Sequence, residues 1–238
     1  MILRTRYVWL MAFVCAGQST TAFAQDGSET GSLIRRAPMA RLSDRPGLSD
    51  ADRGRAVAAD YAFCLLRRHD RDVRAFAETP FMTEASIKAI QSLSNPDCLY
   101  NAKITMPYAL IRGAIFRALY VKDYGKTDLM VGDEAPDYSG SVGDPSLAIN
   151  ATQLMLLDFA GCVIRKDAAS VKKVLLAEAG SDAEKNAFTA LAPAFGPCLP
   201  QHKTVQFSKA SLGAVLSEAM YRIARNNMAG AKIPSGNM

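Results

Sequence analysis

The stretch DYAFCLLRRHD at residues 60–70 returns as DFAGCVIRKDA at residues 158–168, 98 positions further along the chain. Each copy carries an aspartate, a cysteine and an arginine at positions i, i+4 and i+7, which share one face of an α-helix. Apolar residues surround the cysteine at helical spacing in both copies. The two stretches therefore predict a helix in each half of the chain, and they indicate that the halves are copies of one unit.

A second cysteine follows the first at a similar distance in each half. Cys98 comes 34 residues after Cys64, and Cys198 comes 36 residues after Cys162, while Cys15 stands apart near the N-terminus. Four cysteines allow three pairings, and the repeat favours one bridge inside each unit, Cys64–Cys98 and Cys162–Cys198. A redox role often uses a C-x-x-C arrangement, which these cysteines lack. We therefore expect two structural disulfides and an oxidising compartment.

Further matches follow near the end of each unit, where GAI at 113–115 returns as GAV at 213–215. Apolar periodicity, N-cap residues and proline breaks predict about four helices in each unit. We expect an all-α fold in which two similar helical units, each with one disulfide, pack face to face as one pseudo-two-fold domain.

The expected organisation can be given by residue ranges. The chain is predicted to hold a signal peptide at 1–24, a flexible lead-in at 25–47, a first helical unit at 48–122, a Gly- and Asp-rich connection at 123–144, a second helical unit at 145–226 and a disordered tail at 227–238. Helices are expected at 50–68, 70–78, 83–94 and 107–122 in the first unit, then at 145–166, 168–178, from Ser181 to Pro193 and from Ser208. A short strand is expected at 129–131.

The N-terminus has the three parts of a secretory signal peptide. Arg4 and Arg6 precede an uncharged apolar run at 7–16, and the small residues Ala22 and Ala24 precede Gln25. The run is too short to span a bilayer. Cleavage lowers the net charge from +5 to +3, which is too small a positive charge to indicate nucleic-acid binding. These features predict a periplasmic or secreted protein without a transmembrane span.

The repeated helix face offers one candidate site. Asp60 and Arg67 of the first copy correspond to Asp158 and Arg165 of the second. Two arginines can form an anion site, or each can pack and form hydrogen bonds inside its own unit. We favour the structural interpretation, because an active site is rarely duplicated intact.

Residues suited to catalysis or metal binding are few. The two histidines, His69 and His202, do not occupy matching positions, so we expect no metal site and no cofactor. Asp133, Glu134 and Asp137 cluster in the central connection and are weak candidate acids. One region is rich in aromatic residues: Tyr108, Phe116, Tyr120, Tyr124 and Tyr138. Most of them are expected in the core, and an exposed subset could form a binding groove.

The signal peptide, the D-[YF]-A-x-C motif and the later DCL or PCL resemble uncharacterised exported helical proteins of Gram-negative bacteria with a duplicated two-cysteine unit. The resemblance covers most of residues 58–223 and implies export, duplication and a helical fold, with no assigned activity. Two functions stay open. One is a periplasmic binding or interaction module, whose partner is an envelope protein or polymer. The other is a hydrolase of a cell-envelope polymer that uses the carboxylates of the connection. We favour the first, and whether the chain is an enzyme stays open.

Overall fold

Local chemistry sets the ends of the first helices. In the computed structural model, α1 (Asp50–Arg68) begins after Ser49, whose side chain accepts a hydrogen bond from the Asp52 amide. The backbone leaves helical geometry at His69, and α2 (Asp70–Glu78) then runs to Thr79, just before Pro80. An N-cap oxygen satisfies one of the amides left free at a helix start, and proline cannot continue a helix.

The structure describes residues 47–99, 105–132, 134–199 and 207–231. The expected signal peptide and nearly all of the expected lead-in lie outside these ranges. The remaining helical elements are α3 (Glu84–Ser92), η1 (Pro96–Leu99), α4 (Tyr108–Tyr124), η2 (Ser139–Ser141), α5 (Ala148–Leu176), α6 (Asp182–Leu191), η3 (Ala192–Ala194), η4 (Gly196–Cys198) and α7 (Lys209–Ala231).

The all-α prediction is confirmed for the described ranges, where extended pairing is limited to an isolated bridge between Phe81 and Val142. The strand expected at 129–131 is wrong, because those residues are irregular. The expected tail also begins too early: α7 continues to Ala231, and residues 232–238 lie outside the described ranges.

The long helix α5 contains the two helices that the sequence predicts for its region. Asp167 has non-helical backbone angles (φ −155°, ψ 73°), and its side chain accepts a hydrogen bond from the Ser170 amide at 2.9 Å. Asp167 therefore caps the second segment as an N-cap residue does. It follows His69, the break between α1 and α2, by 98 residues, so both halves bend at matching positions. The pseudo-two-fold arrangement itself stays a prediction.

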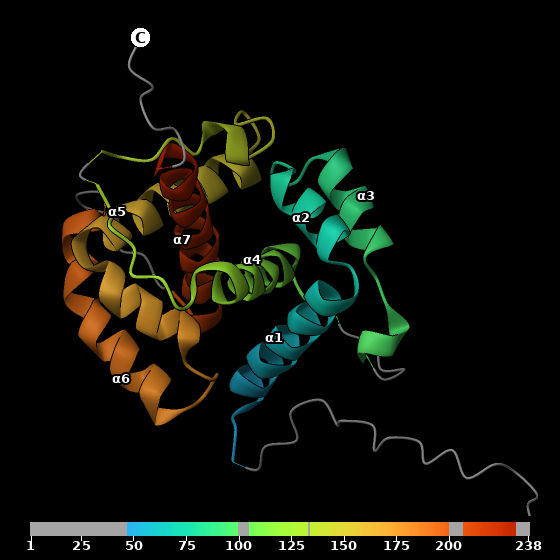
Figure 1. Cartoon of the computed structure of the whole chain (residues 1–238), viewed down its shortest axis with the longest axis horizontal. Coiled ribbons are helices and arrows are strands. Elements are labelled where there is room, and N and C mark those ends of the chain that lie inside the picture. The colour runs from blue at the N-terminus through green and yellow to red at the C-terminus, as the bar shows by residue number, and fades with distance from the viewer. Residues whose placement is uncertain (1–46, 100–104, 133, 200–206, 232–238) are drawn as a thin grey trace, which may run out of the picture. The chain divides into compact units, whose positions relative to one another are not determined.

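Two helices, α4 and α7, make the central packing of the described unit (Figure 1). Helix α1 packs on α4, α5 packs on α7, and α6 packs on α5. A fully buried ion pair joins the central helices, with Arg112 of α4 donating to Glu218 of α7 at 2.9 Å. Arg222, one turn further along α7, donates to the same carboxylate. Within the described ranges, no helix has both the length and the apolarity needed to cross a membrane.

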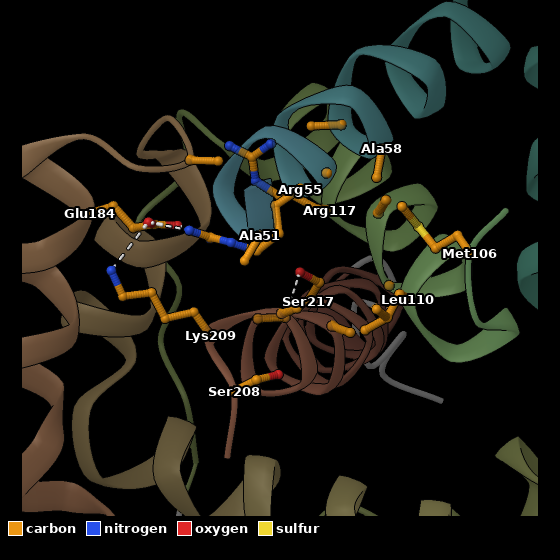
Figure 2. A pocket seen from close by; sticks show the side chains of 18 of the residues that line it. Ala51, Arg55, Ala58, Met106, Leu110, Arg117, Glu184, Ser208, Lys209 and Ser217 are labelled. Carbon is orange, nitrogen blue, oxygen red and sulfur yellow. Dashed lines mark hydrogen bonds and ion pairs between the residues drawn. The ribbon is translucent and has the colours of Figure 1, made fainter. Parts of the chain in front are cut away.

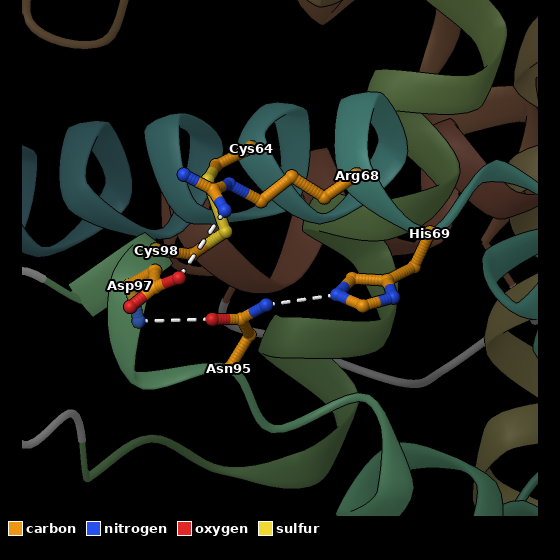
Figure 3. The surroundings of a disulfide bond; sticks show 6 residues. All are labelled: Cys64, Arg68, His69, Asn95, Asp97 and Cys98. Atoms are coloured by element: carbon orange, nitrogen blue, oxygen red, sulfur yellow. Dashed lines mark hydrogen bonds and ion pairs between the residues drawn. A yellow bond between two sulfur atoms is a disulfide. The ribbon is translucent and has the colours of Figure 1, made fainter.

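Both predicted disulfides are confirmed. Cys64 of α1 bonds Cys98 of η1, and Cys162 of α5 bonds Cys198 of η4. Around the first bridge, Arg68 pairs with Asp97, and Asn95 binds the His69 ring at 2.8 Å (Figure 3). Each bridge therefore fixes a short helical turn onto the first long helix of its own half.

The second part of the central connection is anchored to the helices. Tyr138 is buried and lies against Gly161 of α5. Phe81, between α2 and α3, donates its amide to the Ser141 carbonyl at 2.8 Å and accepts from the Gly143 amide at 2.9 Å. These contacts explain why a segment rich in glycine and aspartate takes a defined path here.

Candidate ligand-binding cavity

A cavity of about 390 Å³ lies between α1, α4 and α7, with residues of the α5–α6 turn at one end (Figure 2). Its walls are mainly small or apolar, and the residues that give it this character are Ala51, Gly54 and Ala58 of α1, Leu110, Gly113 and Ala114 of α4, and Ala210, Gly213 and Ala214 of α7. The cavity opens to solvent at the exposed residues Asp50, Ser208 and Lys209, so a dissolved molecule could reach its apolar walls.

The cavity walls on α4 and α7 come from one repeated pattern. On each helix the lining residues follow i, i+3, i+4 and i+7 spacing, at 110, 113, 114 and 117 and again 100 positions later at 210, 213, 214 and 217. This spacing places four residues on one helical face. The matching faces of the two halves therefore meet at the cavity.

The two matched glycines have different surroundings. A Cβ added at Gly113 would lie 2.3 Å from the Cβ of Ala214, so the backbones of α4 and α7 approach closely there. A Cβ added at Gly213 would meet no atom within 4 Å, and the same holds for Gly54 on α1. The seam, by which we mean the contact between α4 and α7, is therefore tight at Gly113 and borders the cavity at Gly213.

The α1 wall has no small-residue equivalent in the second half. Ala51, Gly54 and Ala58 correspond, 98 positions on, to the larger residues Ile149, Thr152 and Leu156. None of these three larger residues lines the cavity. The cavity is therefore a feature in which the two halves differ.

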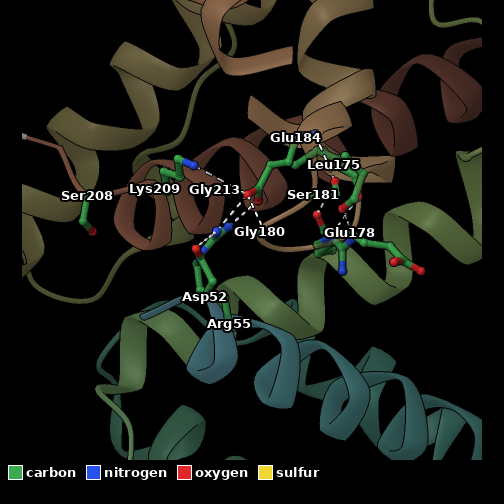
Figure 4. Close-up of polar contacts among 12 residues, drawn as sticks. Asp52, Arg55, Leu175, Glu178, Gly180, Ser181, Glu184, Ser208, Lys209 and Gly213 are labelled. Atoms are coloured by element: carbon green, nitrogen blue, oxygen red, sulfur yellow. Dashed lines mark hydrogen bonds and ion pairs between the residues drawn. The ribbon is translucent and has the colours of Figure 1, made fainter. Parts of the chain in front are cut away.

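A charged network lines one end of the cavity (Figure 4). Arg55 of α1 donates to both carboxylate oxygens of Glu184 on α6, and it also pairs with Asp52. The Gly180 amide donates to Glu184 at 3.0 Å. The ammonium of Lys209, the first residue of α7, lies 3.9 Å from the same carboxylate. This network joins the start of α1 to the start of α6.

Partners outweigh burial in setting the pKa of Glu184. Burial of the side chain would raise that pKa, but hydrogen bonds from Arg55 and the Gly180 amide hold it below the ordinary value. Burial likewise would lower the pKa of Arg55, and its bonds to Glu184 and Asp52 raise it. The pair is therefore ionised at neutral pH.

Arg117 lines the same cavity with a different set of partners. Its guanidinium donates to the carbonyls of Leu175 and Ala177, both at 2.8 Å. Among the described residues, no carboxylate lies within 4 Å of it. Burial lowers the pKa of Arg117, and the charge of Arg55 acts in the same direction, while the charges of Glu184, Asp60 and Glu178 act to raise it. The cavity wall thus contains a half-buried cation that has acids nearby but forms its hydrogen bonds to two neutral carbonyls.

The repeated helix-face residues are not brought together by the fold. Asp60, Arg67 and Asp158 are exposed, Arg165 is half-buried, and none of them lines the cavity. Desolvation, with a smaller effect of the Asp137 charge, raises the pKa of Asp158. This acid lies on an open surface of α5.

The candidate acids of the connection also lie away from the cavity. Asp133 falls outside the described residues, and Glu134 and Asp137 are exposed. The Ser139 amide donates to the Asp137 carboxylate at 2.8 Å and lowers its pKa. Within the ranges that the structure covers, no group of three or more His, Cys, Asp or Glu side chains is placed to hold a metal ion.

The aromatic residues lie in or against the core, as expected, and none of the five lines the cavity. Phe116, Tyr120 and Tyr138 are buried in the core, and Tyr108 and Tyr124 are half-buried against it. Four lining residues were not predicted as site residues from the sequence: Gly54, Arg117, Lys209 and Gly213. The available signal was the pair of small residues, glycine then alanine, on one face of α4 and again of α7, which is also a pattern of close helix packing and gives no cavity by itself.

Comparisons with known protein families, with curated proteins and with solved structures find no match to this chain.

Proposed function

We propose that the chain is an exported binding protein that holds a small, mainly apolar molecule in the cavity between α1, α4 and α7. The cavity itself carries the proposal. Its volume of about 390 Å³ falls in the usual range of ligand pockets, about 300–1,000 Å³. Apolar walls with a few polar groups at one end are typical of such pockets.

Two further observations support a binding role. The two disulfides are typical of proteins in oxidising compartments, which fits export. The candidate acids of the hydrolase alternative are exposed where the structure describes them, and they line no part of the cavity.

The test fills the cavity from one wall. Gly213→Leu places an isobutyl group in the open space, whereas the matched control Gly213→Ala adds a single methyl group at the same point. We expect 1-decanol to bind the wild type and Gly213→Ala in isothermal titration calorimetry, and to lose binding to Gly213→Leu. Gly54→Leu and Gly54→Ala repeat the comparison from the α1 wall. Equal binding to the Leu and Ala variants at both positions contradicts the proposal.

A further inference from the structure

The charged end of the cavity holds donors that its carboxylates leave unused. Arg117 gives two hydrogen bonds to carbonyls, which are neutral acceptors, and no described carboxylate reaches it. A guanidinium has five N–H donors. Arg117 is half-buried and has no carboxylate of the described ranges in ion-pair contact, so an anion that reached its remaining donors would gain charge-assisted hydrogen bonds.

Lys209 is the second cation that could donate hydrogen bonds to a ligand. Its ammonium is 3.9 Å from Glu184, which is beyond hydrogen-bond distance. Its side chain is 47% exposed, so it lies at the rim, where a ligand group can reach it. Arg55, in contrast, is already paired with two carboxylates, those of Glu184 and Asp52.

The acids at this end are poorly placed to receive a cationic ligand. The two Glu184 oxygens already accept from Arg55, and one also accepts from Gly180. Asp50, which also lines the cavity, is exposed in the first turn of α1. The available polar groups therefore complement a negative charge.

We infer that the ligand is an amphipathic carboxylate, with its apolar body between α1 and α7 and its anionic head group at Lys209 and Arg117. This inference rests on the proposed function, because it assigns the head group of a molecule held in the same cavity. The small residues Gly54, Ala58 and Gly213 leave room for an unbranched apolar body, and the contacts of Arg117 and Lys209 both lie at the end of α5 and the start of α6.

Three probes with unbranched alkyl chains of nearly equal length separate the contribution of the head group from that of the cavity. Decanoate, 1-decanol and decyltrimethylammonium are titrated into the whole chain by calorimetry at low salt. We expect decanoate to bind at least about 10-fold more tightly than 1-decanol, since hydrogen bonds to charged groups are the stronger class. Added NaCl reduces this advantage by screening. Equal affinity for the first two probes, or tighter binding of the cation, overturns the head-group assignment.

Two variants locate the head group. Lys209→Met is expected to weaken decanoate binding about 10-fold and to leave 1-decanol unchanged. The control Lys185→Met changes an exposed lysine of α6 outside the cavity and is expected to alter neither affinity. Arg117→Gln is expected to act like Lys209→Met. Because Arg117 also binds two carbonyls, the urea unfolding midpoint of the Arg117→Gln variant is measured as well. If that variant does not fold, Lys209→Met still tests the assignment, because Lys209 is exposed.

The outcomes distinguish the two claims. If 1-decanol binds and Gly213→Leu abolishes its binding, while decanoate gains nothing from Lys209, the cavity is a binding site and the head-group assignment is wrong. If none of the three probes binds the wild type, the proposed function fails together with the inference.

Discussion

At the residue scale, the fully buried ion pair between Arg112 and Glu218 is central to the core. Arg112 also donates to the Thr79 carbonyl at 2.9 Å, and its guanidinium lies over the rings of Phe76 and Phe116. One side chain therefore joins α4, α7 and the end of α2. The repeat does not predict this role, because the second half has leucine at the matching position, 212.

Arg112→Met is expected to lower the free energy of unfolding by roughly 3–5 kcal/mol, since it leaves a buried carboxylate with fewer partners. The double variant Arg112→Met, Glu218→Met is expected to lose less, because it removes both charges. Urea denaturation measures both. Arg71→Met, at an exposed arginine, is the control and should change stability by less than about 0.5 kcal/mol. A double variant less stable than the single one contradicts this account.

Glu184 makes the stability of the chain depend on pH. Its pKa is lower in the folded chain than its ordinary value of 4.5, so the unfolded chain takes up its proton first as pH falls. This contribution is fully present above pH 4.5 and is lost as pH falls through the lowered folded pKa.

Glu184→Gln is therefore expected to flatten the acid side of the stability profile, measured as urea midpoints across that window. Glu84→Gln changes an exposed glutamate of α3 and serves as the control. Wild-type and Glu184→Gln profiles that run parallel below pH 4.5 would show that the Arg55–Glu184 contact contributes nothing.

At the scale of the elements, α4 and α7 are matched in sequence and unequal in packing. Gly113→Ala forces a methyl group against Ala214, and overpacking of this kind costs about 1–3 kcal/mol. Gly213→Ala meets open space, and alanine is favoured over glycine in a helix by up to about 1 kcal/mol. Thermal unfolding should therefore shift in opposite directions for the two variants. Shifts of the same sign contradict the described seam.

Each disulfide is expected to stabilise its own half to a similar degree. The bridges close loops of 34 and 36 residues, and in the chain-entropy estimate each contributes about 3–4 kcal/mol. Replacing Cys64 and Cys98 by serine, or Cys162 and Cys198, should give similar losses in guanidinium denaturation. A pair whose removal leaves the midpoint unchanged would show that its bridge constrains nothing in the unfolded chain.

The boundaries of the elements were predictable where a side chain or a proline sets them. Ser49 caps α1, Thr83 caps α3 and Ser181 caps α6. Serine and threonine are strongly preferred at the N-cap position, so they indicate a helix start in the sequence. The path of residues 129–131 was not predictable in this way. A short apolar run forms a strand only if another strand pairs with it, and the described residues supply none there.

At the scale of the whole molecule, the repeat predicted the bridges and the helical class, but the cavity depends on tertiary contacts. Gly113 and Gly213 are both followed by alanine and occupy matching positions, yet one lies at a close helix crossing and the other borders open space. The same limit applies to Arg117, whose partners come from the end of α5. Only the packing of the two halves reveals which small residues leave room.

The central claim is that the cavity between α1, α4 and α7 holds an amphipathic carboxylate, and a crystal structure of the chain grown with decanoate tests it most directly. The account predicts density for the alkyl chain between Gly54 and Gly213, with the carboxylate within hydrogen-bond distance of Lys209 or Arg117. An alkyl chain bound elsewhere, or a cavity filled by a segment of this chain while decanoate is present, would contradict it.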